Sequence, residues 1–160
     1  MKLEQLSDVV SFTIGKNPTR IKEQELILYS LEDFENDLYG ITEQSNKSEC
    51  IINLIKSKVA PVSVDNKDKC ITSNFLKCEF NEGKDFEQQI AMVHQGTTLS
   101  VKKLNMKIVG ELKIRLPDIE TQHKIGEIYR QSLVQNRLMI EQAENIKKLT
   151  LTIIRKLEED

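Results

Sequence analysis

Four consecutive residues, Gln95-Gly96-Thr97-Thr98, have the types and spacing of a turn that contacts nucleic acid. Glycine lets the backbone approach a ligand closely, and the threonine hydroxyls can donate to phosphate or to base edges. The glutamine amide can form a bidentate pair with adenine. By themselves these residues fit an ordinary helix C-cap better, so both interpretations remain open at this point.

Basic residues gather directly after this turn, although the chain is slightly acidic overall. The 160 residues carry 23 Lys and Arg against 25 Asp and Glu, a formal net charge of -2. Residues 97–117 hold five basic side chains and one acidic one, whereas residues 23–49 hold one basic and eight acidic side chains. Because basic side chains neutralise phosphates, the first stretch is a candidate DNA-binding surface. The alternative for each lysine is an ordinary solvated surface.

Polar and basic residues beside other predicted turns extend this candidate surface. Asn17 and Arg20 flank a proline turn, Lys56 lies between two predicted strands, and Lys58 begins the second of them. The full candidate DNA-binding set is Asn17, Arg20, Lys56, Lys58, Gln95, Gly96, Thr97, Thr98, Lys102, Lys103, Lys107, Lys113 and Arg115.

The sequence contains no pattern typical of catalysis or of metal binding. Its 3 cysteines form no CxxC motif, its 2 histidines have unsuitable spacings, and no P-loop or Ser-His-Asp arrangement occurs. We therefore expect no enzymatic activity, no cofactor and no metal in this chain. No apolar run reaches the roughly 20 residues that span a bilayer, and the first residues do not resemble a secretory signal, so the expected compartment is the cytoplasm.

Residues 1–117 predict a domain of α+β class with a mixed or antiparallel sheet. Stretches rich in β-branched and aromatic residues predict strands over residues 26–31, 51–55, 58–64 and 71–80. The spacing of Phe86, Ile90 and Val93 predicts a short helix over residues 85–94. Between residues 112 and 116 apolar and basic side chains alternate, which is typical of a strand with one buried and one basic face.

Residues 118–160 predict one long helix with Asp118 as its N-cap. A helix of about 40 residues is ~60 Å long and overreaches a domain of this size. Its apolar residues recur in steps of four and three, as in a coiled coil, so we expect its distal half to pair with another helix, most simply a second copy of the chain, parallel or antiparallel. The alternatives are pairing with a different subunit and a helix that folds back onto its own domain. The predicted dimerisation residues are Ile125, Tyr129, Met139, Ala143, Ile146, Ile153 and Leu157.

Taken together, these stretches resemble the specificity subunit of type I restriction-modification systems. The resemblance spans nearly the whole chain and is strongest between residues 90 and 129. It rests on Asn17-Pro18-Thr19-Arg20, Ile71-Thr72-Ser73-Asn74-Phe75-Leu76, Gln95-Gly96-Thr97-Thr98 with Val101-Lys102-Lys103-Leu104, and Ile114 to Gly126 with its Leu116-Pro117 stop.

The resemblance implies a DNA-binding, non-catalytic subunit that selects the target for a methyltransferase (modification) subunit and a restriction subunit. Family members carry two target recognition domains, each followed by a long helix, whereas this chain holds one such unit. It therefore resembles a half-subunit, with a target recognition domain at residues 1–117, a coiled-coil helix at residues 118–160 and homodimerisation through that helix. The alternative is a truncated relative that acts as a protein-interaction adaptor and does not read DNA.

Overall fold

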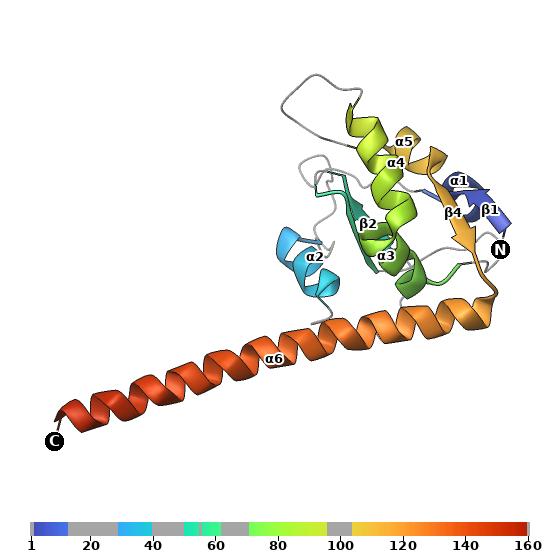
Figure 1. The fold of residues 1–160 in the computed structure, drawn as a ribbon. Helices are drawn as coiled ribbons and strands as arrows, with labels where there is room; N and C mark the ends of the chain where they lie inside the picture. The colour runs from blue at the N-terminus through green and yellow to red at the C-terminus, as the bar shows by residue number, and fades with distance from the viewer. Residues whose placement is uncertain are drawn as a thin grey trace, which may run out of the picture.

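The computed structural model describes residues 2–12, 29–39, 50–54, 56–61, 71–95 and 104–159. These residues form a small head of short helices and strands, followed by one long helix that extends beyond it (Figure 1). In chain order the elements are β1 (Lys2–Gln5), α1 (Leu6–Val9), α2 (Leu31–Leu38), β2 (Cys50–Asn53), β3 (Lys58–Pro61), α3 (Ser73–Glu82), α4 (Lys84–Gln95), α5 (Met106–Glu111), β4 (Lys113–Leu116) and α6 (Ile119–Glu159).

Two separate antiparallel sheets of two strands each lie in the head. The first pairs the two ends of the head, with Lys2 of β1 opposite Leu116 of β4. The second is the β2–β3 hairpin, with Asn53 opposite Lys58. The predicted α+β class is therefore confirmed, as are the helix over residues 85–94 and the described parts of the strands near residues 51–55, 58–64 and 112–116.

The core of the head lies between these sheets and the helices around them. In β4 only Ile114 of the central residues is buried, while Lys113 and Arg115 are exposed, which confirms the predicted alternation. The helices α1, α3, α4 and α5 and the strands β3 and β4 each contribute a buried side chain to one cluster. The buried cluster consists of Leu6, Val9, Val10, Val59, Ile71, Phe75, Leu76, Phe80, Phe86, Leu104, Val109, Leu112 and Ile114.

Two side-chain amides form hydrogen bonds with backbone groups at the open edges of the two-stranded sheets. Asn81 of α3 pairs with both backbone groups of Val59 in β3, at 2.7 and 2.8 Å. Gln89 of α4 does the same for Lys113 in β4, at 2.7 and 2.9 Å. A backbone polar group without a partner is costly in a protein interior, so these amides attach α3 and α4 to the sheet edges.

One predicted strand is wrong, and a second is wrong over its described residues, because local helix signals prevail over β propensity. In the stretch predicted as a strand over residues 71–80, α3 begins after Thr72 and buries Phe75, Leu76 and Phe80 at helical spacing. The strand predicted over residues 26–31 ends in helix α2, whose N-cap Ser30 forms a capping box with Asp33. Residues 26–28 lie outside the described part.

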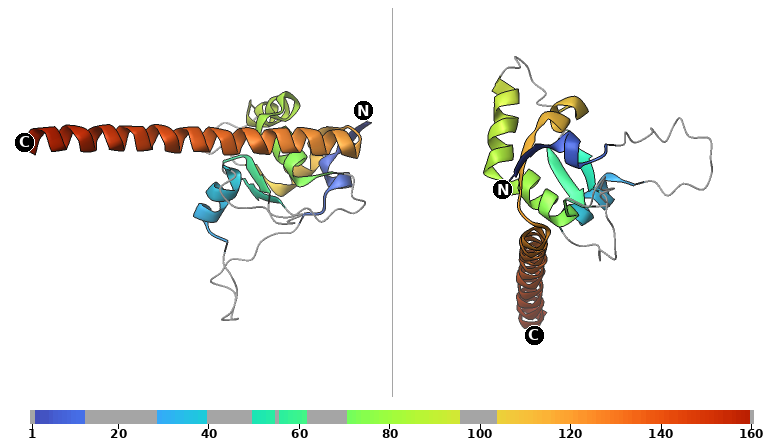
Figure 2. Two further views of the ribbon diagram at one scale, coloured as in Figure 1. Left: turned by 90° about the horizontal axis from the view of Figure 1, so that it is seen from below. Right: turned by 90° about the vertical axis from the view of Figure 1, so that its right-hand side faces the viewer.

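The long helix α6 has 41 residues and is about 60 Å long. Asp118 accepts a hydrogen bond from the Thr121 amide at 2.9 Å, which confirms its predicted role as N-cap. Near its start α6 packs against α3, and in the left view of Figure 2 the rest of the helix extends beyond the head. From residue 138 to residue 159 every side chain of α6 is exposed.

Close contact between α6 and α3 depends on Gly126 and Gln122. A Cβ atom on Gly126 would lie 2.8 Å from Asn74 Cβ and 3.0 Å from Phe75 N, so only glycine permits this approach. The amide of Gln122 is buried and bridges two segments, because it accepts from Thr72 N at 3.0 Å and donates to Pro117 O at 3.0 Å. The orientation of α6 relative to the head is thereby fixed at its first turns.

Candidate functional site

Three of the predicted DNA-binding residues lie on consecutive elements, α5 and β4, which we call the basic edge: Lys107, Lys113 and Arg115. All three are exposed. Arg115 Nε lies 2.8 Å from Asp85 Oδ2 at the start of α4. Among the described residues, no carboxylate forms an ion pair with the ammonium of Lys107 or Lys113. Two cations on this edge are therefore available for an external anion without first breaking an ion pair in the described structure.

The hairpin lysines are engaged within the head. Lys56 forms an ion pair with Glu35 of α2. Lys58 Nζ donates to Asn81 O at 2.8 Å and lies 3.9 Å from Glu82 Oε1. Exposed ion pairs of this kind contribute little stability, so a polyanion can displace the carboxylates, but at the cost of these contacts.

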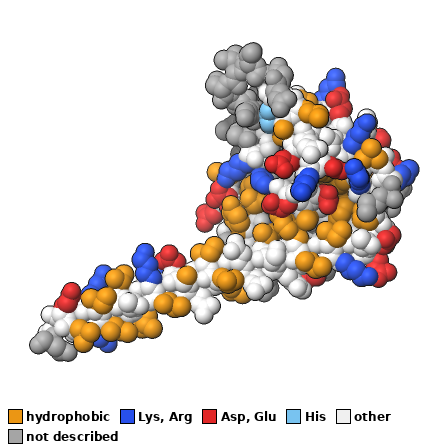
Figure 3. Space-filling model, viewed as in Figure 1, with side chains coloured by type: hydrophobic (Ala, Val, Ile, Leu, Met, Phe, Trp, Pro, Cys, Tyr) orange, Lys and Arg blue, Asp and Glu red, His pale blue; other side chains and the backbone are white. Residues whose placement is uncertain are grey.

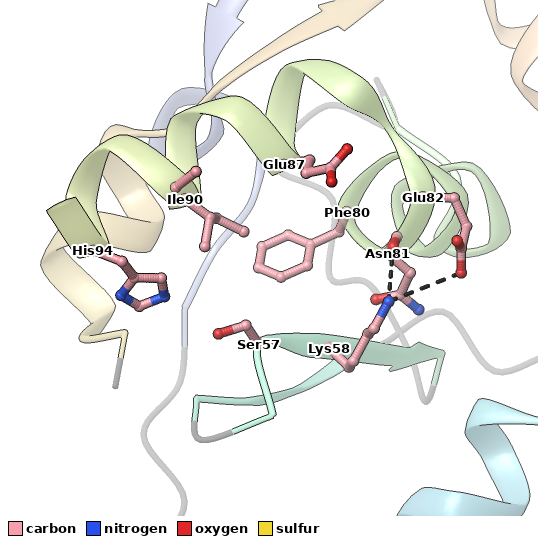
Figure 4. Close-up of a pocket in the computed structure, with 9 residues that line it drawn as sticks. Ser57, Lys58, Phe80, Asn81, Glu82, Glu87, Ile90 and His94 are labelled. Atoms are coloured by element: carbon pink, nitrogen blue, oxygen red, sulfur yellow. Dashed lines mark hydrogen bonds and ion pairs between the residues drawn. The ribbon is translucent and has the colours of Figure 1, made fainter. Parts of the chain in front are cut away.

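An open cleft is lined by the start of β3, the C-terminal end of α3 and one side of α4 (Figure 4). Its volume is about 640 Å³. Lys58 projects from the hairpin toward Glu82, and His94 lies near the C-terminal end of α4, directly before Gln95. The fold thus brings the hairpin and the end of α4, which are far apart in the sequence, to one concave surface. The complete lining is Ser57, Lys58, Phe80, Asn81, Glu82, Glu87, Ile90, Ala91 and His94.

The carboxylates of Glu82 and Glu87 make this cleft unsuitable as the main phosphate-binding surface, because like charges repel a polyanion. The basic edge has the better electrostatics for phosphate. Sequence reasoning did not identify Asn81, Glu82 or Glu87 as surface-shaping residues. The wrong strand prediction over residues 71–80 concealed the end of α3, so no signal placed its polar end opposite the hairpin.

The remaining predicted DNA-binding residues cannot be placed on this surface. Gln95 is the last residue of α4, and its side chain is outside the described structure. The others lie outside the described residues: Asn17, Arg20, Gly96, Thr97, Thr98, Lys102 and Lys103.

The predicted dimerisation residues divide into two groups. Ile125 is partly buried and packs against the core of the head. The Tyr129 hydroxyl donates to Glu82 Oε1 at 3.1 Å, and its ring lies 5.7 Å from Lys77 Nζ. These two side chains serve the contact of α6 with its own head. The other five are exposed and project from the helix: Met139, Ala143, Ile146, Ile153 and Leu157.

A buried lysine joins α2, α3 and α6, which the sequence did not reveal. Lys77 of α3 is buried and donates to Asp37 O at 3.1 Å, while the Tyr29 hydroxyl donates to Asp37 Oδ2 at 2.7 Å. Burial and the Glu82 carboxylate raise the pKa of Tyr129 above its ordinary value. Burial and the hydrogen bond to Asp37 do the same for the pKa of Tyr29. Both phenols therefore remain protonated donors at neutral pH.

The described residues contain no group of three or more His, Cys, Asp or Glu side chains that could hold a metal ion. None of the described helices is long and apolar enough to span a membrane. Protein-family models, curated proteins and solved structures provide no match to this chain.

Proposed function

We propose that this protein is a DNA-specificity half-subunit that resembles those of type I restriction-modification complexes. In this proposal the head is a small target recognition domain, and α6 joins two copies of the chain and docks a methyltransferase subunit. The restriction subunit joins the same complex. The chain itself carries out no chemistry, and its role is to select where the partner acts.

One observation carries the proposal, namely the way the helix leaves the head. β4 pairs with β1, and after Pro117 the chain enters a helix that packs against α3 near its start and is exposed from residue 138 to residue 159. Beyond the head, apolar side chains stay exposed along the helix (Figure 3). A recognition unit joined to a long assembly helix is the arrangement that the resemblance implies. Exposed apolar surface of this extent is typical of a protein–protein interface.

The basic edge supports the DNA-binding part of the proposal. It carries Lys107, Lys113 and Arg115, and the predicted contacts Lys102 and Lys103 precede it closely in the sequence. If all five side chains contact phosphates, the logarithm of the binding constant falls with the logarithm of salt concentration with a slope of about -4.5 per head.

The adaptor function remains a second candidate, because part of the predicted DNA-binding set is engaged in ion pairs. Lys56, Lys58 and Arg115 each face a carboxylate of the same head. An adaptor would need α6 and its partner, but not free cations on the head.

A titration of duplex DNA with the purified chain at several salt concentrations distinguishes the two functions. The proposal expects binding that weakens steeply as salt rises. Gln95→Ala should then reduce discrimination between preferred and mismatched duplexes by about 1–3 kcal/mol, the scale of one good base contact, and leave self-association unchanged. A chain that binds no duplex even at low salt, yet retains a methyltransferase subunit in co-purification, would support the adaptor instead.

A further inference from the structure

The exposed surface of α6 contains a stripe of uncharged residues that repeats every 11 positions. From Ile128 to Leu157 the stripe advances in steps of three, four and four residues. All nine members are exposed, and none is charged. We call this the 11-residue stripe, and it consists of Ile128, Gln131, Gln135, Met139, Gln142, Ile146, Thr150, Ile153 and Leu157.

The geometry of the helix favours this stripe over a heptad stripe. Eleven residues make slightly more than three turns of an α-helix, so an 11-residue repeat drifts by about 20° per 11 residues, more slowly than a heptad repeat, which drifts by about 20° per seven residues. α6 is one unbroken helix with only a gentle bow (Figure 1). The heptad positions Ile125 and Tyr129 accordingly turn toward the head, where both pack against it. The 11-residue stripe avoids the head altogether.

Ile128 shows that the stripe continues past the head. It lies between residues that pack on α3, yet 69% of its surface is exposed. At the other end Leu157 is 71% exposed. The stripe therefore presents one continuous face of about 45 Å, beside the head as well as beyond it.

We propose that a second copy of this chain covers the 11-residue stripe, so that two α6 helices pair with little supercoiling or a slight right-handed one. An 11-residue repeat gives this hand, in contrast to the left-handed heptad coil. The inference rests on the homodimer of the proposed function and names the face that forms it.

Charge and composition identify a second copy as the occupant. In a symmetric pair both copies present the same patch, so two uncharged stripes can cover each other without burying a charged side chain, whichever way the helices run. From residue 137 to residue 155 all charged side chains of α6 lie off the stripe: Arg137, Glu141, Glu144, Lys147, Lys148 and Arg155. The amides of Gln131, Gln135 and Gln142 can donate to and accept from their counterparts in either relative orientation of the helices.

At three places a residue of the 11-residue stripe is directly followed by a residue of the heptad stripe: 131 by 132, 135 by 136, and 142 by 143. Substitutions at these neighbouring positions give two variants that differ only in which stripe carries the change. One triple variant carries Gln131→Lys, Gln135→Lys and Gln142→Lys, and the other carries Ser132→Lys, Asn136→Lys and Ala143→Lys. All six residues are exposed, and both variants add three charges to the same helix. Sedimentation equilibrium measures the mass of each full-length chain, and circular dichroism checks its helix content.

The proposal expects a dimeric wild type, a monomeric first variant and a dimeric second variant. The reverse result would assign the seam to the heptad stripe. Two monomeric variants would indicate a broader interface, and two dimeric variants would place the interface elsewhere, so both results overturn the proposal. A monomeric wild type would overturn it too. Because the assay contains no DNA, none of these results bears on duplex binding by the head.

Discussion

The first and last parts of α6 have similar amino-acid patterns and opposite environments. Between residues 119 and 134 the helix packs against α3 through Gln122, Gly126 and Tyr129. From residue 138 onward every described side chain of the helix is exposed, the apolar ones included. An apolar residue on a helical stripe therefore does not reveal whether its partner is the same chain or another one. In α6 a small residue and a polar residue mark the part that packs on its own head. Gly126 permits the close approach to α3, and the buried amide of Gln122 fixes where the helix crosses the head.

The largest expected effect comes from Gln122→Leu. Leucine cannot replace the hydrogen bonds to Thr72 N and Pro117 O, so two partly buried backbone groups lose their partners. We expect the free energy of unfolding to fall by about 2–4 kcal/mol in urea titrations. The matched control is Gln142→Leu on the free part of α6, which should leave stability unchanged or raise it. Equal losses in the two variants would show that Gln122 does not anchor the helix.

Gly126→Val should have the next largest effect. The new side chain would overlap Asn74 and the Phe75 amide, and α6 would have to move away from α3. We expect a loss of about 1–3 kcal/mol in the free energy of unfolding. Ala143→Val, at an exposed position, should cost less than about 0.5 kcal/mol. A Gly126→Val protein as stable as the wild type would contradict the close packing of the two helices.

Charge removal tests the division between a DNA-binding head and an assembly helix. Lys107→Ala combined with Lys113→Ala should make the salt slope of duplex binding shallower by about two units, since each lost phosphate contact removes about 0.9. Lys147→Ala combined with Lys148→Ala removes the same charge from the free part of α6. This control should leave the slope unchanged. Equal changes in both variants would indicate nonspecific attraction to the whole molecule.

Asp118→Ala should have the smallest effect, and this effect should depend on pH. Hydrogen bonds from Thr121 hold the pKa of the Asp118 carboxyl below its usual range. A lowered pKa in the folded state adds stability above the unfolded pKa of about 3.9 and loses it as pH falls through the folded value. The variant should therefore melt below the wild type at pH 7, and the gap should shrink below about pH 4. A gap that stays constant to pH 2 would exclude the ionised cap as its cause.

Sequence patterns predicted the elements whose local signals agree with one another. The alternation around Ile114, the Asp118 cap and the helical spacing of Phe86 and Ile90 are all found in the structure. The helices α2 and α3 were missed because capping and packing prevail over β-branched composition at Ser30 and Thr72. Strand propensity depends on tertiary context, so it was the weaker guide there.

The candidate surfaces were predictable only in part. The sequence indicated the cations of the basic edge, but not that Arg115 faces Asp85 or that Lys58 faces Glu82. Such pairs join residues 24 to 30 positions apart, so no local sequence pattern predicts them. The contacts of Lys77 with Asp37 and Tyr129 also join residues far apart in the sequence. They could not be predicted, because a lysine side chain is normally exposed to solvent.

Selection of bound duplexes from a randomised pool tests DNA recognition most directly. Full-length wild-type chain is incubated with the pool at moderate salt, and the bound duplexes are sequenced over several rounds. If two heads joined by α6 read DNA, the pool should converge on a bipartite sequence with a fixed spacing, and Gln95→Ala should relax the preference at one position of each half. A pool that remains random, with all duplexes bound equally or not at all, would contradict recognition by the head.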